Sequence, residues 1–169
     1  MPIRRLLLAL SPAVAAAHVG YFYSRLPLRV ASHFNLAGDA NGWMSRTAFA
    51  GSYVVLIALM AVVYCGLGWL LRRVPNGAIN LPRRDYWLAP ERRERTLEDI
   101  GRRLAGMGIA TVLFLMVVFQ LCIRANLDGT FRLPLNAMTL PLAFFITTLA
   151  LWLGRIVWRY GRPEAFSAE

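Results

Sequence analysis

The sequence predicts an all-α integral membrane protein with four transmembrane helices, cytoplasmic termini, and a short strand-and-turn lid between the first and second helices. The first observation is composition: 57% of the 169 residues are hydrophobic, 17% are charged and the mean hydropathy is +0.48. Soluble domains carry about 25% charged residues. The second observation is a set of four long apolar runs, and the third is the placement of arginine around them. The length fits one membrane domain, 1–169, with short connections.

Each apolar run is long enough to cross a hydrocarbon layer about 30 Å thick, which takes about 20 helical residues. The runs cover residues 6–23, 48–71, 104–123 and 135–158. Because a bilayer offers no water to the backbone, the amide groups of each run must pair internally, and a helix achieves this. The sequence therefore predicts four spanning helices rather than apolar loops.

The first run also has a second interpretation. Arg4 and Arg5, an apolar stretch and three consecutive alanines at 15–17 fit a cleaved signal peptide. The apolar run nevertheless continues to Tyr23 and ends in aromatic residues, which is typical of a helix anchored at the membrane interface. We therefore expect the first helix to be retained.

The distribution of arginine predicts the orientation. All 19 basic residues are arginine, against nine acidic residues. Two lie in the N-terminal stub, nine in the 72–103 connection and three at or beyond the end of the last run, whereas the loops 24–47 and 124–134 hold five. Since cytoplasmic loops retain positive charge, both termini and the Arg-rich loop 72–103 are predicted to be cytoplasmic. The expected partners are the lipid bilayer and its anionic phospholipid headgroups, not nucleic acid.

Polar residues inside the runs are few. Interhelical hydrogen bonds are expected from the polar side chains His18, Thr111, Gln120, Thr147 and Thr148. Ala9, Ala13 and Ala17 are expected to form a stripe for close helix packing. No Asp or Glu lies inside a run, which argues against an ion-coupled transporter. The two cysteines lie at different depths and no Cys/His spacing fits a metal. The sequence therefore predicts no cofactor, no metal and no catalytic set.

The cytoplasmic loop 72–103 holds a group of aromatic residues and arginines that we interpret as a membrane-interface anchor. Its members are Arg83, Arg84, Tyr86 and Trp87. Beyond them, three Glu/Asp-to-Arg pairs four residues apart predict a helix that begins near Pro90 and continues to Ile123. A docking site for a cytoplasmic protein is the alternative for this loop.

The outer loop 24–47 is predicted to form the lid. Pro27 and Val30 favour extended chain, and turns are expected at Asn35–Gly38 and at Asn41–Gly42. Ser45 is placed to cap the second spanning helix. The candidate ligand-binding residues of the lid are His33, Phe34, Asn35, Gly38, Gly42 and Trp43.

The stretch between Leu26 and Arg46 reads Leu-Pro, an Arg, then His-Phe-Asn-x-x-Gly-x-x-x-Gly-Trp. It resembles a small domain of unknown function found in bacterial membrane proteins and at the N-terminus of Sdp-type toxin-immunity proteins. The resemblance covers roughly residues 5–70, and Ala31 and Ser32 replace a proline and an aliphatic residue of the pattern. It implies a multi-span protein of the bacterial inner membrane. Sdp-type proteins are longer and have additional spans, so immunity is implied less directly.

Three classes of function remain. The first is a non-enzymatic inner-membrane protein that senses or sequesters a ligand through its lid, in regulation or in toxin immunity, with an extracellular peptide, a lipid headgroup or a membrane protein as partner. The second is a structural or accessory subunit of a membrane complex, and the third is a small transporter or a membrane enzyme. For His33, we favour hydrogen bonding to the backbone of the lid. Ligand recognition, and metal binding with Asp39 or His18, are the alternatives.

Overall fold

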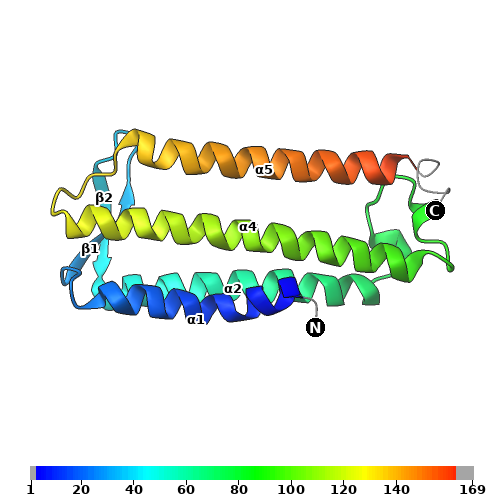
Figure 1. The fold of residues 1–169 in the computed structure, drawn as a ribbon, viewed down its shortest axis with the longest axis horizontal. Helices are drawn as coiled ribbons and strands as arrows, with labels where there is room; N and C mark the ends of the chain where they lie inside the picture. The colour runs from blue at the N-terminus through cyan, green and yellow to red at the C-terminus, as the bar shows by residue number, and fades with distance from the viewer. Residues whose placement is uncertain (1–2, 163–169) are drawn as a thin grey trace.

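The computed structural model describes residues 3–162, a mostly helical chain with a small two-stranded sheet (Figure 1). The elements are α1 (Ile3–Tyr23), β1 (Arg29–Phe34), β2 (Ala40–Ser45), α2 (Arg46–Arg73), the 3₁₀ turn η1 (Asn76–Ala78), α3 (Arg84–Trp87), α4 (Arg93–Leu127) and α5 (Leu135–Gly161). Four of the described helices, α1, α2, α4 and α5, are long and apolar enough to cross a membrane. This confirms a mostly helical chain with four helices that could span a membrane; which side each end faces stays a prediction.

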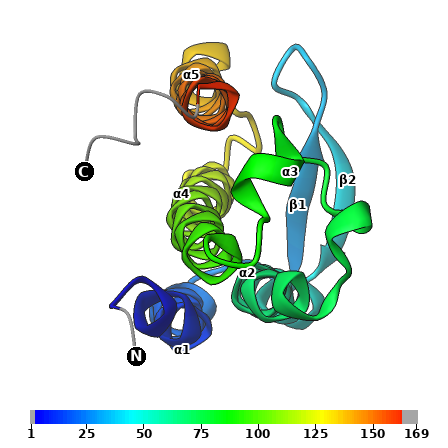
Figure 2. The same ribbon diagram turned by 90° about the vertical axis from the view of Figure 1, so that its right-hand side faces the viewer.

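The four long helices lie side by side, with α4 between the α1–α2 pair and α5 (Figures 1 and 2). Both strands lie at one end of the bundle, which we call the hairpin end, and the connection between α2 and α4 lies at the other, the arginine end. The largest apolar core joins α1, α2 and α4, and it includes Leu8, Ala15, Tyr53, Ile57 and Val112. In contrast, no residue in the most apolar 18-residue stretch of α5 is buried.

Helices α2 and α4 differ in how well the sequence predicts where they begin and end. Helix α2 begins directly after Ser45, whose hydroxyl accepts a hydrogen bond from the Ala48 amide at 3.1 Å, so the predicted cap is confirmed. Helix α4 begins at Arg93 rather than Pro90, because the Ala89 carbonyl first accepts the amides of residues 92 and 93 in a separate turn. It also continues past the predicted end to Leu127.

The predicted packing face of α1 is wrong. Ala9, Ala13 and Ala17 are exposed, whereas α1 contacts its neighbours through a stripe that includes Ala15 and Val19. Close helix approach occurs instead between α2 and α4, where a Cβ atom added to Gly108 would lie 2.6 Å from Cγ of Tyr64. Small residues predict that helices approach closely, but they do not show which face of a helix makes the contact when several faces carry small residues.

Three of the polar side chains predicted to link helices do so, whereas Thr148 donates to the Phe144 carbonyl of its own helix at 2.9 Å. The imidazole of His18 on α1 makes hydrogen bonds to Tyr53 Oη on α2, at 3.0 Å, and to Gln120 Oε1 on α4, at 2.7 Å. Thr111 on α4 makes a further bond to Tyr64 Oη on α2, at 3.1 Å. The two His18 bonds hold the hairpin-end half of α1 against α2 and α4, and the Thr111 bond joins α4 to α2.

The lid between α1 and α2 is an antiparallel hairpin of β1 and β2. In Figure 2 it extends from the end of α2 past α4 and toward α5. The Asn35–Gly38 turn is present, with Gly38 at φ +83°. Asn41 and Gly42, in contrast, lie inside β2 and form no turn, because Gly42 pairs with His33 across an irregularity in the register.

Candidate functional site

The hairpin is fixed to α4 by one buried side chain, that of Asn126. Its amide oxygen accepts from the Ala31 backbone N–H at 2.8 Å, and its amide nitrogen donates to the Ala31 carbonyl at 2.9 Å. The same nitrogen donates to the Cys122 carbonyl at 2.8 Å, which orients the amide on the helix. Asn126 therefore pairs with the free edge of β1 as a neighbouring strand would. A single asparagine near the end of an apolar run gave no sequence signal for this role.

The turn of the hairpin is docked on the loop between α4 and α5. The side-chain oxygen of Asn35 accepts from the amides of Ala37 and Asp39, each at 2.9 Å, which closes the turn. The Leu133 amide then donates to the Gly38 carbonyl at 2.8 Å. A Cβ atom at position 38 would collide with the Leu133 carbonyl oxygen, so only glycine fits this turn. Asn35 and Gly38 thus shape and seat the lid.

Two side-chain contacts accompany this docking. Asp39 forms an ion pair with Arg132 at 2.7 Å, but both side chains are about half exposed or more, so the pair contributes little to stability. The ring of Trp43 lies beside that of Phe131, with the ring centroids 5.1 Å apart. Trp43 therefore belongs to the outer surface of the docked lid.

His33 stands on the exposed side of β1, across from Gly42. A Cβ atom at position 42 would lie 2.9 Å from the His33 Cβ, so the glycine leaves room for the imidazole. The His33 Nδ1 atom shares a hydrogen bond of 3.0 Å with the Ser32 hydroxyl, which also lies 3.3 Å from the Gly42 carbonyl. Contact with the lid backbone therefore runs through Ser32, not directly from the ring. Among residues 3–162, the Nε2 atom of His33 has no hydrogen-bond partner, and no cluster of metal-ligating side chains is found.

Two cavities lie beneath the hairpin, and they meet at shared residues. One, of about 430 Å³, lies between the hairpin, α2 and α4; the other, of about 420 Å³, lies between the hairpin, α4 and α5. Ser32, His33, Val118 and Cys122 line both. We call the two cavities together the trough. Its floor is α4, its walls are α2 and α5, and the hairpin covers its end.

The predicted lid residues divide between the trough and the lid's own structure. His33, Phe34, Asn35 and Gly38 line the trough, whereas neither Gly42 nor Trp43 does. Sequence reasoning missed the remaining walls, which are apolar: Leu56 and Leu59 on α2, and Met138 and Leu142 on α5, are among the lining residues. Apolar residues within a spanning helix look alike in sequence whether they face lipid or a cavity.

The predicted interface anchor joins parts of the chain at the arginine end. Its members are Arg83, Arg84, Tyr86 and Trp87. The Trp87 side chain is buried, with its residue only 8% exposed, and its Nε1 atom donates to the Tyr160 carbonyl at 2.7 Å. Arg83 Nε donates to the Gly161 carbonyl at 3.0 Å. A buried indole needs an acceptor, and the last carbonyls of α5 lack helical partners, so the two satisfy each other. Trp87 therefore does not face lipid; contact of Arg83, Arg84 and Tyr86 with headgroups stays a prediction.

Comparison with known proteins finds a match over part of the chain. Residues 10–61 match a domain of unknown function, DUF1648. The match spans most of α1, the hairpin and the first half of α2, and it supports the resemblance to a domain of unknown function. No curated protein and no solved structure matches the chain. Asn126 and Leu133, which hold the hairpin in place, lie outside the matched residues.

Proposed function

We propose that this protein is a non-enzymatic binding protein of the bacterial inner membrane that holds an amphipathic ligand in the trough beneath its hairpin. One observation carries the proposal: the two cavities share a polar rim at Ser32 and His33 and an apolar floor at Val118 and Cys122. Each volume falls in the range of about 300–1,000 Å³ typical of small-molecule sites.

The chemistry of the trough matches a ligand with one polar end and one hydrocarbon chain. The walls below the rim are mainly aliphatic and aromatic, with residues such as Leu56, Leu142 and Phe49. The rim offers an imidazole nitrogen without a partner in the described chain, together with the Ser32 hydroxyl. The apolar walls of a pocket bury the apolar surface of a ligand, and its polar groups fix the orientation of the ligand. The hydrocarbon chain of the ligand would therefore lie along α4, with its polar end at His33.

The arginine distribution favours an outward-facing hairpin end, and with that orientation the ligand would come from the outer leaflet or the extracellular space. An immunity role would use the same trough for an apolar segment of an extracellular peptide. Orientation is testable by labelling intact cells with a membrane-impermeant maleimide after both native cysteines are replaced. We expect Leu36→Cys, at a side chain that is 94% exposed on the hairpin turn, to be labelled, and Asp85→Cys to be protected. The reverse pattern would invert the orientation.

Ligand binding is testable with cis-parinaric acid, a fatty acid whose fluorescence rises in apolar surroundings. Val118→Trp fills the floor of the trough, so the affinity of this variant for the probe should fall about tenfold or more. A tenfold fall corresponds to a loss of only about 1.4 kcal/mol in binding free energy. Val117→Trp is the matched control, because the neighbouring side chain lines different cavities of α4. Equal affinity in the two variants would refute binding in the trough.

The polar rim has its own test. His33→Ala changes an exposed side chain, so we expect the fold to persist while binding of the fatty acid weakens. The methyl ester of the same fatty acid lacks the carboxylate charge, so His33→Ala should weaken binding of the ester less than binding of the acid. If both ligands weaken equally, His33 contributes only surface area and does not recognise the polar end.

A structural or accessory subunit is the second candidate, and the exposure of α5 favours it. Leu140 and Phe144 are 72% and 76% exposed, and α5 packs against α4 alone among the long helices (Figure 2). Native mass spectrometry from mild detergent is the test. A stoichiometric membrane-protein partner that is lost in Phe144→Ser would support the subunit role.

A further inference from the structure

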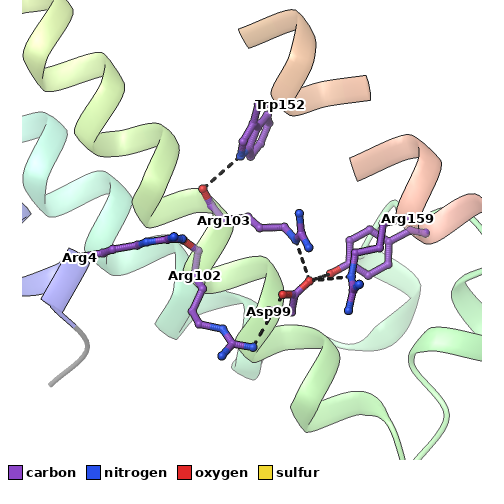
Figure 3. Close-up of polar contacts among 7 residues, drawn as sticks. Arg4, Asp99, Arg102, Arg103, Trp152 and Arg159 are labelled. Atoms are coloured by element: carbon purple, nitrogen blue, oxygen red, sulfur yellow. Dashed lines mark hydrogen bonds and ion pairs between the residues drawn. The ribbon is translucent and has the colours of Figure 1, made fainter. Parts of the chain in front are cut away.

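The arginine end contains a charged cluster that the trough does not use. Figure 3 shows Asp99 of α4 facing Arg103 from its own helix and Arg159 from α5. The Nε atoms of these two arginines lie 2.7 Å and 3.1 Å from Asp99 Oδ2, and the Tyr160 hydroxyl donates to the same oxygen at 2.8 Å. One carboxylate oxygen therefore receives three donors, and the cluster fastens the end of α5 to α4.

Positive charge exceeds negative charge around this carboxylate. Its second oxygen, Oδ1, lies 3.8 Å from Nη2 of Arg102, a distance too long for a hydrogen bond. Burial alone would raise the pKa of Asp99, but the hydrogen bonds from Arg103 and Tyr160 and the arginine charges hold that pKa below its ordinary value. Asp99 therefore stays ionised, and one negative charge faces three arginines.

A fourth arginine approaches from α1. Arg4 Nη1 donates to the Arg102 backbone carbonyl at 3.0 Å (Figure 3). Its guanidinium lies along α4 beside Gly106, where an added Cβ would be 3.5 Å from Nη1. Arg102 is 55% exposed at its side chain and Arg4 is exposed as well. Both guanidinium groups are thus accessible, and the bond from Arg4 to the Arg102 carbonyl joins the start of α1 to α4.

This surface lies where charge gives way to hydrocarbon. The apolar run of α4 begins at Leu104, directly after Arg102 and Arg103. On the α5 side, the Trp152 indole donates to the Arg103 carbonyl at 3.1 Å. In a bilayer spanned by this apolar run, the guanidinium groups would lie at the depth of the phosphates, next to the acyl chains.

We propose that Arg4 and Arg102 bind the phosphate of an anionic phospholipid at the arginine end. Guanidinium groups match phosphate oxygens with paired N–H donors. Arg102 approaches the Asp99 carboxylate only at 3.8 Å, and Arg4 contacts a backbone carbonyl instead of a carboxylate, so both guanidinium groups keep donors for a phosphate. The adjoining apolar run accommodates the acyl chains, which favours a phospholipid over free phosphate. The site stands independently of the trough, since the two lie at opposite ends of the bundle.

Native mass spectrometry of the full chain in detergent tests the site, with phosphatidylglycerol as the probe and phosphatidylcholine as the neutral comparison. An arginine near an anionic surface contributes about fivefold in affinity, so Arg4→Gln and Arg102→Gln should each weaken phosphatidylglycerol binding about fivefold and the double variant about 25-fold. Arg95→Gln is the matched control, because it removes an exposed arginine from the same helix outside the cluster. Phosphatidylcholine should not be retained.

Four results would overturn the assignment. Equal weakening by Arg95→Gln would mean that binding depends on net charge, and unchanged binding in the double variant would place the lipid elsewhere. Displacement of the lipid by millimolar inorganic phosphate would mean that the site takes phosphate itself. Full binding by Arg102→Lys would contradict the guanidinium geometry, since we expect that variant to recover only part of the affinity.

Discussion

Replacing Asn126 by alanine should release the hairpin from α4 while leaving the helices in place. Asn126 is 4% exposed, and its partner Ala31 is fully buried. The amide side chain satisfies both the N–H and the carbonyl of Ala31, on the edge of β1 that faces α4. Alanine at 126 can satisfy neither, and the docked hairpin leaves these two groups without access to bulk water.

The magnitude follows from those two orphaned groups. A buried backbone donor or acceptor that loses its partner costs about 1–3 kcal/mol, so the two together cost about 2–4 kcal/mol after partial relaxation. The cost falls on the docked state of the hairpin, because the undocked hairpin exposes Ala31 to water. The free energy of local opening should drop by that amount, which corresponds to about 30- to 1,000-fold faster amide exchange.

Hydrogen exchange with mass spectrometry of the peptides that cover β1 measures this change in detergent. Asn80→Ala is the matched control, because it truncates an exposed asparagine at the arginine end. We expect exchange at β1 to accelerate only in Asn126→Ala, with exchange in the middle of α2 unchanged. Wild-type protection of Ala31 in Asn126→Ala would refute the view that this side chain holds the hairpin.

Three further predictions concern stability, measured as thermal unfolding in detergent. Gly38→Ala should destabilise the protein more than Gly129→Ala, because both have positive φ but only position 38 meets a backbone oxygen; equal losses would leave backbone strain alone as the cause. Gly108→Ala should cost about 1–3 kcal/mol by pushing Tyr64 away, and Tyr64→Ala in the same chain should recover part of it. Asp99→Asn should lower stability by about 2 kcal/mol at pH 7. Since the pKa of Asp99 is depressed in the folded state, the difference from wild type should shrink as the pH falls below about 4, and a constant difference would contradict the ion cluster.

The spans, the cap at Ser45 and the turn at Asn35 could be predicted because each depends on residues close together in the chain. A run of about 20 apolar residues crosses a bilayer whatever its neighbours are. A serine before a helix can accept a hydrogen bond from the helix's own amide, and the side chain of an asparagine such as Asn35 can accept from amides two and four residues further on. For the same reason the lid was predictable as a short structure between two helices, although Asn41 and Gly42 were assigned to a turn that the register of β2 excludes.

The candidate site depended on contacts that only the tertiary structure decides. Asn126 meets Ala31 across 95 positions of the chain, and Trp87 meets Tyr160 across 73. In a membrane, lipid is as apolar as a neighbouring helix, so hydropathy does not reveal which face of α1 packs or which face of α4 lines the trough. The sequence alone determined that four segments are long and apolar enough to cross a membrane, and it located the cap at Ser45 and the turn at Asn35. Helix packing determined what those elements enclose.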